Sequence, residues 1–215
     1  ASYSPEALHR RVCCSCRDTD WIEQMVKKNN LDHRFDVTSR VTAQTTHVVA
    51  GAEPCRRTLN VLRAIAYGCW LVSKNWVFKS YVMGQWQLET EFELQEEYPA
   101  AIKERLEREL CKAEGVPYQN TLFQDHRFCI TPRRTVPPKE DLEELIIACS
   151  GQIVKEKSQS TVYVTTTERK PSAAASYHVV SAKWILDSIQ KGMLEPFVEE
   201  EDDESQRRAR RSPEL

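Results

Sequence analysis

Short apolar runs in the first half of the chain alternate with segments in which apolar residues recur every three or four positions. The apolar runs are rich in β-branched, cysteine or aromatic residues and predict strands over 10–16, 45–50 and 70–72. The segments with helical spacing predict helices over 21–26, 59–66 and 73–81. Strands that alternate with helices of this length indicate β-α-β units and a parallel sheet.

The same order of elements returns in the second half of the chain. Its apolar pattern predicts, in turn, a strand over 128–130, a helix over 142–149 and a strand over 161–165. Residues 179–188 then match residues 71–80 at a constant offset of 108, so that Trp184 takes the place of Trp76. At the second strand the offset is 115, which indicates that the second copy has lost residues where the first carries the helix before its third strand. We therefore expect two copies of one small α/β domain.

The repeat divides the chain into four parts. We expect a first domain over 9–98, a linker with a helix over 99–120, a second domain over 121–198 and a charged, disordered tail over 199–215. In the linker, Ile102, Leu106 and Leu110 recur every four residues among charged neighbours. This spacing predicts a helix that packs through that apolar stripe.

Charge and composition exclude several classes of protein. The 215 residues carry 30 Lys and Arg against 32 Asp and Glu, a net charge of −2, and 40% of them are hydrophobic. A chain with this balance does not bind nucleic acid mainly by charge, and we expect no sequence-specific contact with it. No apolar run approaches the roughly 20 residues that cross a bilayer, so we expect no membrane partner. We expect a monomer.

Residues suited to catalysis are sparse. The sequence has no glycine-rich phosphate loop, no GxSxG and no HExxH, and its five histidines are scattered, with His47 inside an apolar strand where a core role is expected. The eight cysteines lie mostly in apolar runs, and none forms the paired spacing of a zinc site. We therefore expect no enzyme, no cofactor and no metal, and reduced thiols in a reducing compartment.

Several motifs resemble a known family. Arg57-Thr58-Leu59, Gly68-Cys69-Trp70 and the paired tryptophans Trp76 and Trp184 are similar to those of tandem BRCT pairs, and the resemblance covers nearly all of residues 9–198. It implies an α/β fold of two BRCT repeats. Each repeat would be a small four-stranded parallel sheet flanked by helices, and the two would pack in tandem through a helical interface.

The family resemblance also implies a function without catalysis. Tandem BRCT pairs of this kind bind phosphoserine in the first repeat and the third residue after it in a groove between the repeats. Ser15 matches the hydroxyl donor to phosphate, and Cys16 stands where a glycine usually supplies a backbone N–H. Asn60 stands where many members have lysine, so it would donate an amide hydrogen bond without charge.

Other positions would bind the rest of the peptide. Arg57 matches an arginine that reads the peptide main chain or its terminal carboxylate, a grip suited to a guanidinium fork. We expect Leu62, Val136, Pro137 and Leu186 to form the wall of the third-residue pocket. The implied partner is the phosphorylated tail of the histone variant that marks DNA breaks, with other cell-cycle phosphoproteins as further partners. The implied location is the nucleus, at chromatin near breaks, and also the centrosome.

Alternatives remain open from the residues themselves. A BRCT pair that binds an unphosphorylated partner is favoured by Cys16 and Asn60, and a binder of DNA ends is disfavoured by the acidic balance. Ser15 alone is typical of a helix cap, and Arg57 could pair with Glu53 on the surface. The apolar pocket residues could be plain core between the repeats.

Overall fold

The computed structural model describes residues 10–15, 20–22, 24–25, 35–51, 55–131, 135–166 and 176–197. Its first sheet consists of β1 (Arg10–Cys14), β2 (Phe35–Thr38), β3 (His47–Ala50) and β4 (Trp70–Ser73). These strands lie in the order β2-β1-β3-β4, and every pairing is parallel. Strands β1, β3 and β4 lie where the apolar pattern predicted strands, whereas β2 was not predicted.

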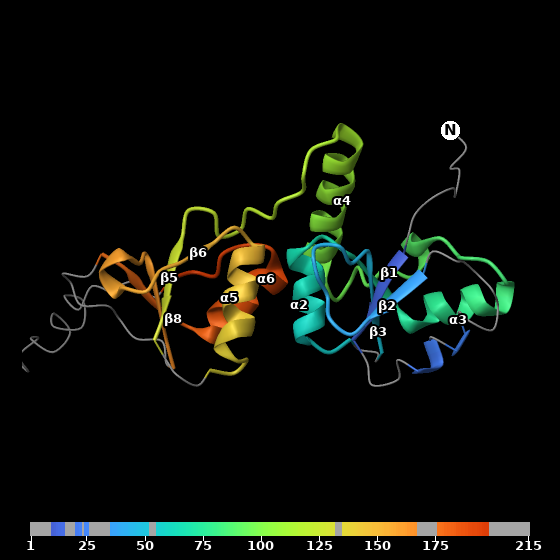
Figure 1. Cartoon of the computed structure of the whole chain (residues 1–215), viewed down its shortest axis with the longest axis horizontal. Coiled ribbons are helices and arrows are strands. Elements are labelled where there is room, and N and C mark those ends of the chain that lie inside the picture. Colours follow the sequence, from blue (N-terminus) through green and yellow to red (C-terminus); the bar gives the residue numbers. More distant parts are fainter. Residues whose placement is uncertain are drawn as a thin grey trace, which may run out of the picture.

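The second sheet repeats the first. It consists of β5 (Arg127–Ile130), β6 (Gln152–Ile153), β7 (Val162–Thr165) and β8 (His178–Ser181) in the order β6-β5-β7-β8, again all parallel (Figure 1). The predicted pair of four-stranded α/β repeats is confirmed.

Helices flank both sheets and join them. The structure has α2 (Leu59–Ala66), α3 (Lys74–Met83), α4 (Pro99–Glu114), α5 (Lys139–Ala148) and α6 (Ala182–Lys191), with short 3-10 helices η1 (Glu89–Glu91) and η2 (Lys157–Gln159). Residues 20–22 and 24–25 are helical as well. Between β7 and β8 the described residues, 166 and 176–177, contain no counterpart of α2, in keeping with the shorter second copy.

The same contacts hold the last helix of each repeat. The Nε1 of Trp76 and that of Trp184 each donate to the backbone carbonyl eleven residues further on, at 3.0 Å in both repeats. Ser80 and Ser188, four residues after these tryptophans, each accept a backbone N–H from the same distant residue at 3.0 Å. Both tryptophans are buried, so the offset of 108 in the sequence corresponds to one repeated packing unit.

One apolar core passes from the first repeat into the second. It includes, among its fully or nearly fully buried side chains, Leu62 and Ile65 of α2, Leu142 and Ile146 of α5, and Ile185 and Ile189 of α6. Helix α2 contacts both α5 and α6, and α4 contacts α2 and α6 (Figure 1). The predicted helical interface between the repeats is therefore present, and α2 lies at its centre.

A separate cluster covers the other face of the first sheet around Trp76. His47 is fully buried there, and its ring stacks on that of Trp76 with centroids 4.8 Å apart. Its Nε2 lies 3.2 Å from a carboxylate oxygen of Glu89. Burial lowers the pKa of His47, so the ring is neutral at pH 7, as expected of a core histidine.

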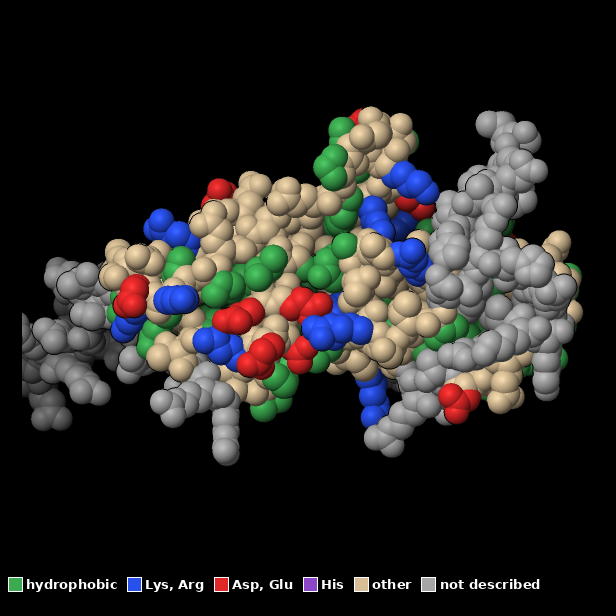
Figure 2. All heavy atoms as spheres, in the orientation of Figure 1, with side chains coloured by type: hydrophobic (Ala, Val, Ile, Leu, Met, Phe, Trp, Pro, Cys, Tyr) green, Lys and Arg blue, Asp and Glu red, His purple; other side chains and the backbone are tan. Residues whose placement is uncertain are grey.

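Charged side chains accompany the apolar interface. Arg63 of α2 is 5% exposed and donates to Glu144 of α5 at 2.8 and 3.1 Å and to Asp141 at 2.5 Å. Arg40 also donates to Glu144. Figure 2 shows acidic and basic side chains gathered over the seam between α5 and α2. A buried guanidinium with two carboxylate partners fixes how the two helices meet.

The linker helix differs from its prediction. The expected inner positions Leu106 and Leu110 are each 52% exposed, and Figure 2 shows hydrophobic side chains on the projecting α4. Its buried side carries Ala100 and Ala101 in the first turn and then Glu104 and Arg105 in place of the leucines. The Arg105 guanidinium lies 3.9 Å from the centroid of the Trp70 ring and pairs with a buried glutamate. The predicted stripe therefore faces outward, because paired charges occupy the inner face.

Candidate functional site

Ser15 directly follows β1 at the carboxyl edge of the first sheet. Its N–H donates to the carbonyl of Val49 at 2.8 Å, and its hydroxyl lies 2.5 Å from the hydroxyl of Thr58. Thr58 is the N-cap of α2, and its Oγ1 accepts the N–H of Val61 at 3.2 Å. Two hydroxyls therefore meet at the N-terminus of a helix whose first turn carries no acidic residue. Such an N-terminus favours an anion.

Asn60 lies in the first turn of α2, two residues after Thr58. Its amide Nδ2 faces the sulfur of Cys13 at 3.4 Å, and its Oδ1 accepts from Arg63 at 3.3 Å. Arg63 is neutralised by its carboxylate partners in the interface, so it adds little field at the helix N-terminus. Cys16, to which the family resemblance assigns a backbone contact with phosphate, lies outside the described residues.

Arg57 connects the two repeats next to this helix start. Its Nη1 donates to Asp187 and, at 3.0 Å, to the Oε1 of Gln190, both on α6 of the second repeat. Burial by itself would raise the pKa of Asp187, but hydrogen bonds from Lys183 and Arg57 outweigh it and hold that pKa below its ordinary value. Glu53, the alternative partner of Arg57, lies outside the described residues.

A pocket of about 350 Å³ opens beside Arg57 at the seam. It is lined by Arg57, Thr58, Leu59, Leu62, Val136, Pro137, Lys183 and Leu186. All five residues predicted for the peptide's third position and main chain thus lie in one pocket. Leu62 is 2% exposed and belongs mainly to the core, whereas Val136 is 92% exposed at the rim.

Three residues of the site have no role in the sequence prediction. Thr58 joins the Ser15 hydroxyl to the pocket, Lys183 lines the pocket, and Asp187 pairs with Arg57. For Thr58 a signal was present, since a threonine directly before a helical apolar pattern is a favoured N-cap. For the other two the sequence shows only a charged helix face.

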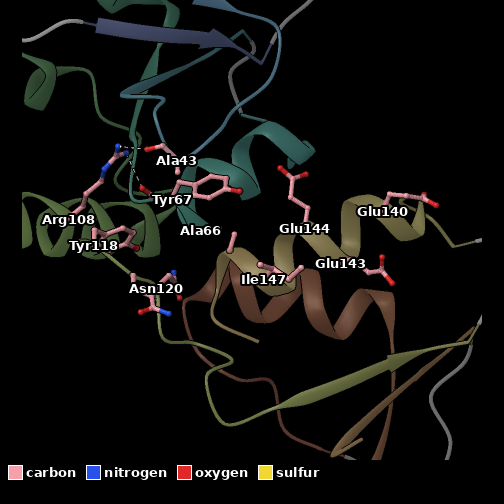
Figure 3. A pocket seen from close by; sticks show the side chains of 12 residues that line it. Ala43, Ala66, Tyr67, Arg108, Tyr118, Asn120, Glu140, Glu143, Glu144 and Ile147 are labelled. Atoms are coloured by element: carbon pink, nitrogen blue, oxygen red, sulfur yellow. Dashed lines mark hydrogen bonds between the residues drawn. The ribbon is translucent and has the colours of Figure 1, made fainter. Parts of the chain in front are cut away.

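A larger hollow of about 750 Å³ lies elsewhere along the seam (Figure 3). Figure 3 shows Arg108 turned toward Ala43 and Tyr67, and its guanidinium donates to their carbonyls at 2.9 and 3.0 Å. Glu144, on its opposite wall, is engaged by Arg63. Arg108 and Glu144 are thus engaged in contacts within the protein. None of the predicted site residues lines this hollow.

Other chemistry can be checked only within the part of the chain that the structure describes. There, no group of three or more His, Cys, Asp or Glu side chains is placed to hold a metal ion, and Cys55, Cys69, Cys111, Cys129 and Cys149 carry free thiols. No helix among the described residues combines the length and apolar character needed to span a membrane.

Comparison with known proteins identifies the class. Residues 11–81 match the family model of the BRCA1 C Terminus (BRCT) domain, and residues 121–199 match a second model of the BRCT domain. The chain belongs to the BRCT family and contains two repeats in tandem. This is a family of binding modules rather than enzymes, in agreement with the expectation of no catalysis.

Among curated relatives the chain is similar to microcephalin. It is 39% identical to the protein of Mus musculus over 163 residues, which are 76% of this chain and 19% of that protein. It is 38% identical to the protein of Homo sapiens over 155 residues, which are 72% of this chain and 18% of that protein. The chain thus spans about a fifth of the length of these relatives.

Solved structures share the tandem fold at low sequence identity. The fifth and sixth BRCT domains of Brc1 from S. pombe give a TM-score of 0.62 at 14% identity, covering 87% of this chain and 95% of that one. Rtt107p, solved in complex with a phosphorylated histone, gives a TM-score of 0.60 at 9% identity, covering 87% of this chain and 88% of that one.

Proposed function

We propose that the chain binds peptides that carry phosphoserine followed, three positions later, by a C-terminal aromatic residue with a free carboxylate. The observation that carries this proposal is the position of Thr58. Its hydroxyl contacts Ser15 at the start of α2, and the same residue lines the seam pocket beside Arg57. A phosphate site and a side-chain pocket that share one residue suit a ligand of a few residues.

The first repeat supplies donors for phosphate. A phosphoserine carries about −1.5 to −2 charges and three acceptor oxygens. One hydroxyl hydrogen of the Ser15–Thr58 pair lies between the two oxygens, and the other would donate to the phosphate. The first N–H groups of α2 and the N–H of Cys16 would donate as well. Asn60 would join by exchanging its weak contact with the Cys13 sulfur for a phosphate oxygen.

The seam pocket supplies the second half of the proposed site. An aromatic side chain that enters it would lie against Leu62, Pro137 and Leu186 and bury enough area for about 2 kcal/mol. The terminal carboxylate would then lie beside Arg57, whose planar guanidinium can donate a hydrogen bond to each of its two oxygens.

The proposed ligand has a natural source in chromatin. We assign it to the phosphorylated tail of the histone variant that marks DNA breaks, with other cell-cycle phosphoproteins as further ligands. Rtt107p, a structural neighbour, was solved with a phosphorylated histone, a ligand of this chemistry. The chain would then act as the reading module of a nuclear scaffold for the DNA-damage response and chromosome condensation, with the centrosome as a second location.

A scaffold that binds without regard to phosphorylation is the second candidate. Asn60 favours it, because the amide brings no positive charge and faces Cys13 in the structure. The two candidates differ in one measurable property, the affinity for a phosphorylated peptide relative to its unphosphorylated twin.

The proposal is tested by replacing Ser15 with alanine and titrating both peptides by fluorescence polarisation. Loss of one charge-assisted hydrogen bond should weaken phosphopeptide binding by about 1 kcal/mol or more, roughly fivefold, and leave the twin unchanged. Ser158→Ala, at an exposed position in the second repeat, is the matched control. Unaltered phosphopeptide affinity in Ser15→Ala would overturn the phosphate role, and equal binding of the twin to the unmodified chain would favour the scaffold.

A further inference from the structure

Two cations from different repeats, Arg57 and Lys183, line the seam pocket, and both pair with Asp187. Arg57 precedes α2, whereas Lys183 and Asp187 lie one turn apart on α6. One oxygen of Asp187 accepts from Arg57, and the other accepts from Lys183. A single carboxylate therefore holds two cations side by side.

Exposure separates the three groups. The Asp187 side chain is 18% exposed, the Arg57 side chain 32% and the Lys183 side chain 74%. The carboxylate is therefore the least exposed of the three groups, and both cations line the pocket.

Arg57 keeps donors for a ligand. Its bonds to Asp187 and Gln190 both come from Nη1, whereas a guanidinium has five N–H donors on three nitrogens. Nη2 and Nε can therefore approach an incoming carboxylate while Asp187 and Gln190 continue to hold the side chain. Lys183 pairs with the same aspartate and lines the same pocket.

We propose that Lys183 acts together with Arg57 as a second cation for the terminal carboxylate of the peptide. This inference rests on the proposed function. The side chains of Lys183 and Arg57 would both contact the carboxylate. Asp187, which pairs with both cations, would keep the two side chains in position. The pocket would then favour peptides that end at the third residue after phosphoserine over peptides that continue or are amidated there.

The test compares phosphoserine peptides with a C-terminal tyrosine three residues later, as the free acid and as the amide. The quantity measured, by fluorescence polarisation, is the dissociation constant of the amide divided by that of the free acid. Lys183→Met should reduce this ratio about threefold to tenfold, the range for one partly exposed charge-assisted contact, by weakening the free acid alone. Lys183→Arg should retain most of the ratio, since it keeps the charge.

Lys191→Met is the matched control, because Lys191 is an exposed lysine on the same helix that pairs with Glu195 and lies outside the pocket lining. An unchanged ratio in Lys183→Met, or an equal loss for acid and amide, would reduce Lys183 to a surface partner of Asp187 and overturn the inference. Failure of the proposed function looks different. The unmodified chain would then bind phosphorylated and unphosphorylated peptides alike, and this inference would fall with it.

Discussion

At the scale of single residues, Thr58 connects helix formation to ligand chemistry. Its hydroxyl caps α2 by accepting the N–H of Val61 and at the same time lies against the hydroxyl of Ser15. The cap fixes the side chain's orientation, and the short contact fixes the end of β1 against the start of α2. Hydroxyl groups positioned in this way lose little further freedom when a phosphate binds.

Asn60 gives the sharpest prediction at this scale. Replacing it with lysine would place a positive charge in the first turn of α2, near the proposed phosphate position. We expect Asn60→Lys to strengthen phosphopeptide binding several-fold, by roughly 1 kcal/mol for one charge-assisted contact, and to steepen its dependence on salt. Titrations at 50 and 300 mM salt would measure both effects. If Asn60→Lys binds the phosphopeptide no more tightly than the unmodified chain at either salt concentration, the phosphate does not bind near the first turn of α2.

Sequence reasoning identified some of these residues and missed others for a physical reason. Ser15 and Arg57 stand in local motifs that can be matched within a few residues of chain. Asp187 and Lys183 act on Arg57 through space, and Arg57 and Asp187 are 130 positions apart in the chain. An apolar or charged pattern along one helix cannot show which distant side chain will meet it.

At the scale of secondary-structure elements, the strands that are apolar runs and the amphipathic helices followed from the sequence pattern, whereas the edge strands β2 and β6 did not. Strand β2 alternates apolar and polar residues over only four positions, and β6 has only two residues, so neither forms an apolar run of the kind that marks the other strands. Helix α4 was predicted with its apolar stripe inward, but its inner face carries Arg105, stacked on Trp70 and paired with Glu93. Long charged side chains that find buried partners can outweigh a stripe of leucines.

The turn after α2 yields a prediction about packing against α4. Gly68 has a φ of +61°, and a Cβ there would lie 2.7 Å from the carbonyl oxygen of Glu104. Gly84 has a similar φ of +65° but nothing within 4 Å. Gly84→Ala should lower the free energy of unfolding by about 1 kcal/mol from backbone strain alone. Gly68→Ala should cost about 1–3 kcal/mol more, because α4 must also move.

Urea unfolding of both glycine variants measures this difference. Equal losses of the free energy of unfolding for Gly68→Ala and Gly84→Ala would show that α4 does not pack closely against the turn after α2. The linker helix would then have to be packed less tightly than the structure shows.

At the scale of the whole molecule, the two repeats act as one unit through α2. This helix contributes apolar side chains to a core shared with α5 and α6, and its Arg63 pairs with Asp141 and Glu144 of the second repeat. The proposed ligand site extends across the same seam. The division of the chain at residues 98, 120 and 198 remains a prediction, and residues 199–215 lie outside the described part.

The charges at the seam predict how stability depends on pH. Burial alone would raise the pKa of Glu144, but hydrogen bonds from Arg40 and Arg63 outweigh it and hold that pKa below its ordinary value. A carboxylate of this kind stabilises the fold fully above its unfolded pKa of about 4.3 and loses that contribution as the pH falls through the lowered value.

Glu144→Gln should therefore lower the free energy of unfolding by roughly 1–2 kcal/mol at pH 7. The difference from the unmodified chain should shrink as the pH is lowered toward about 3. Urea unfolding at several pH values measures it, with Glu140→Gln, an exposed position on the same helix, as the control. A difference that stays constant with pH would mean that the Glu144 charge contributes nothing to the seam.

The most direct test of the central claim, that both repeats read one phosphopeptide together, is a binding measurement with three peptides. The first carries phosphoserine with a free C-terminal tyrosine three residues later, the second is its unphosphorylated twin, and the third has two residues inserted between phosphoserine and tyrosine. We predict strong binding, by fluorescence polarisation, of the first peptide alone, because the phosphate site and the seam pocket are joined at Thr58. Equal binding of all three peptides would contradict the account.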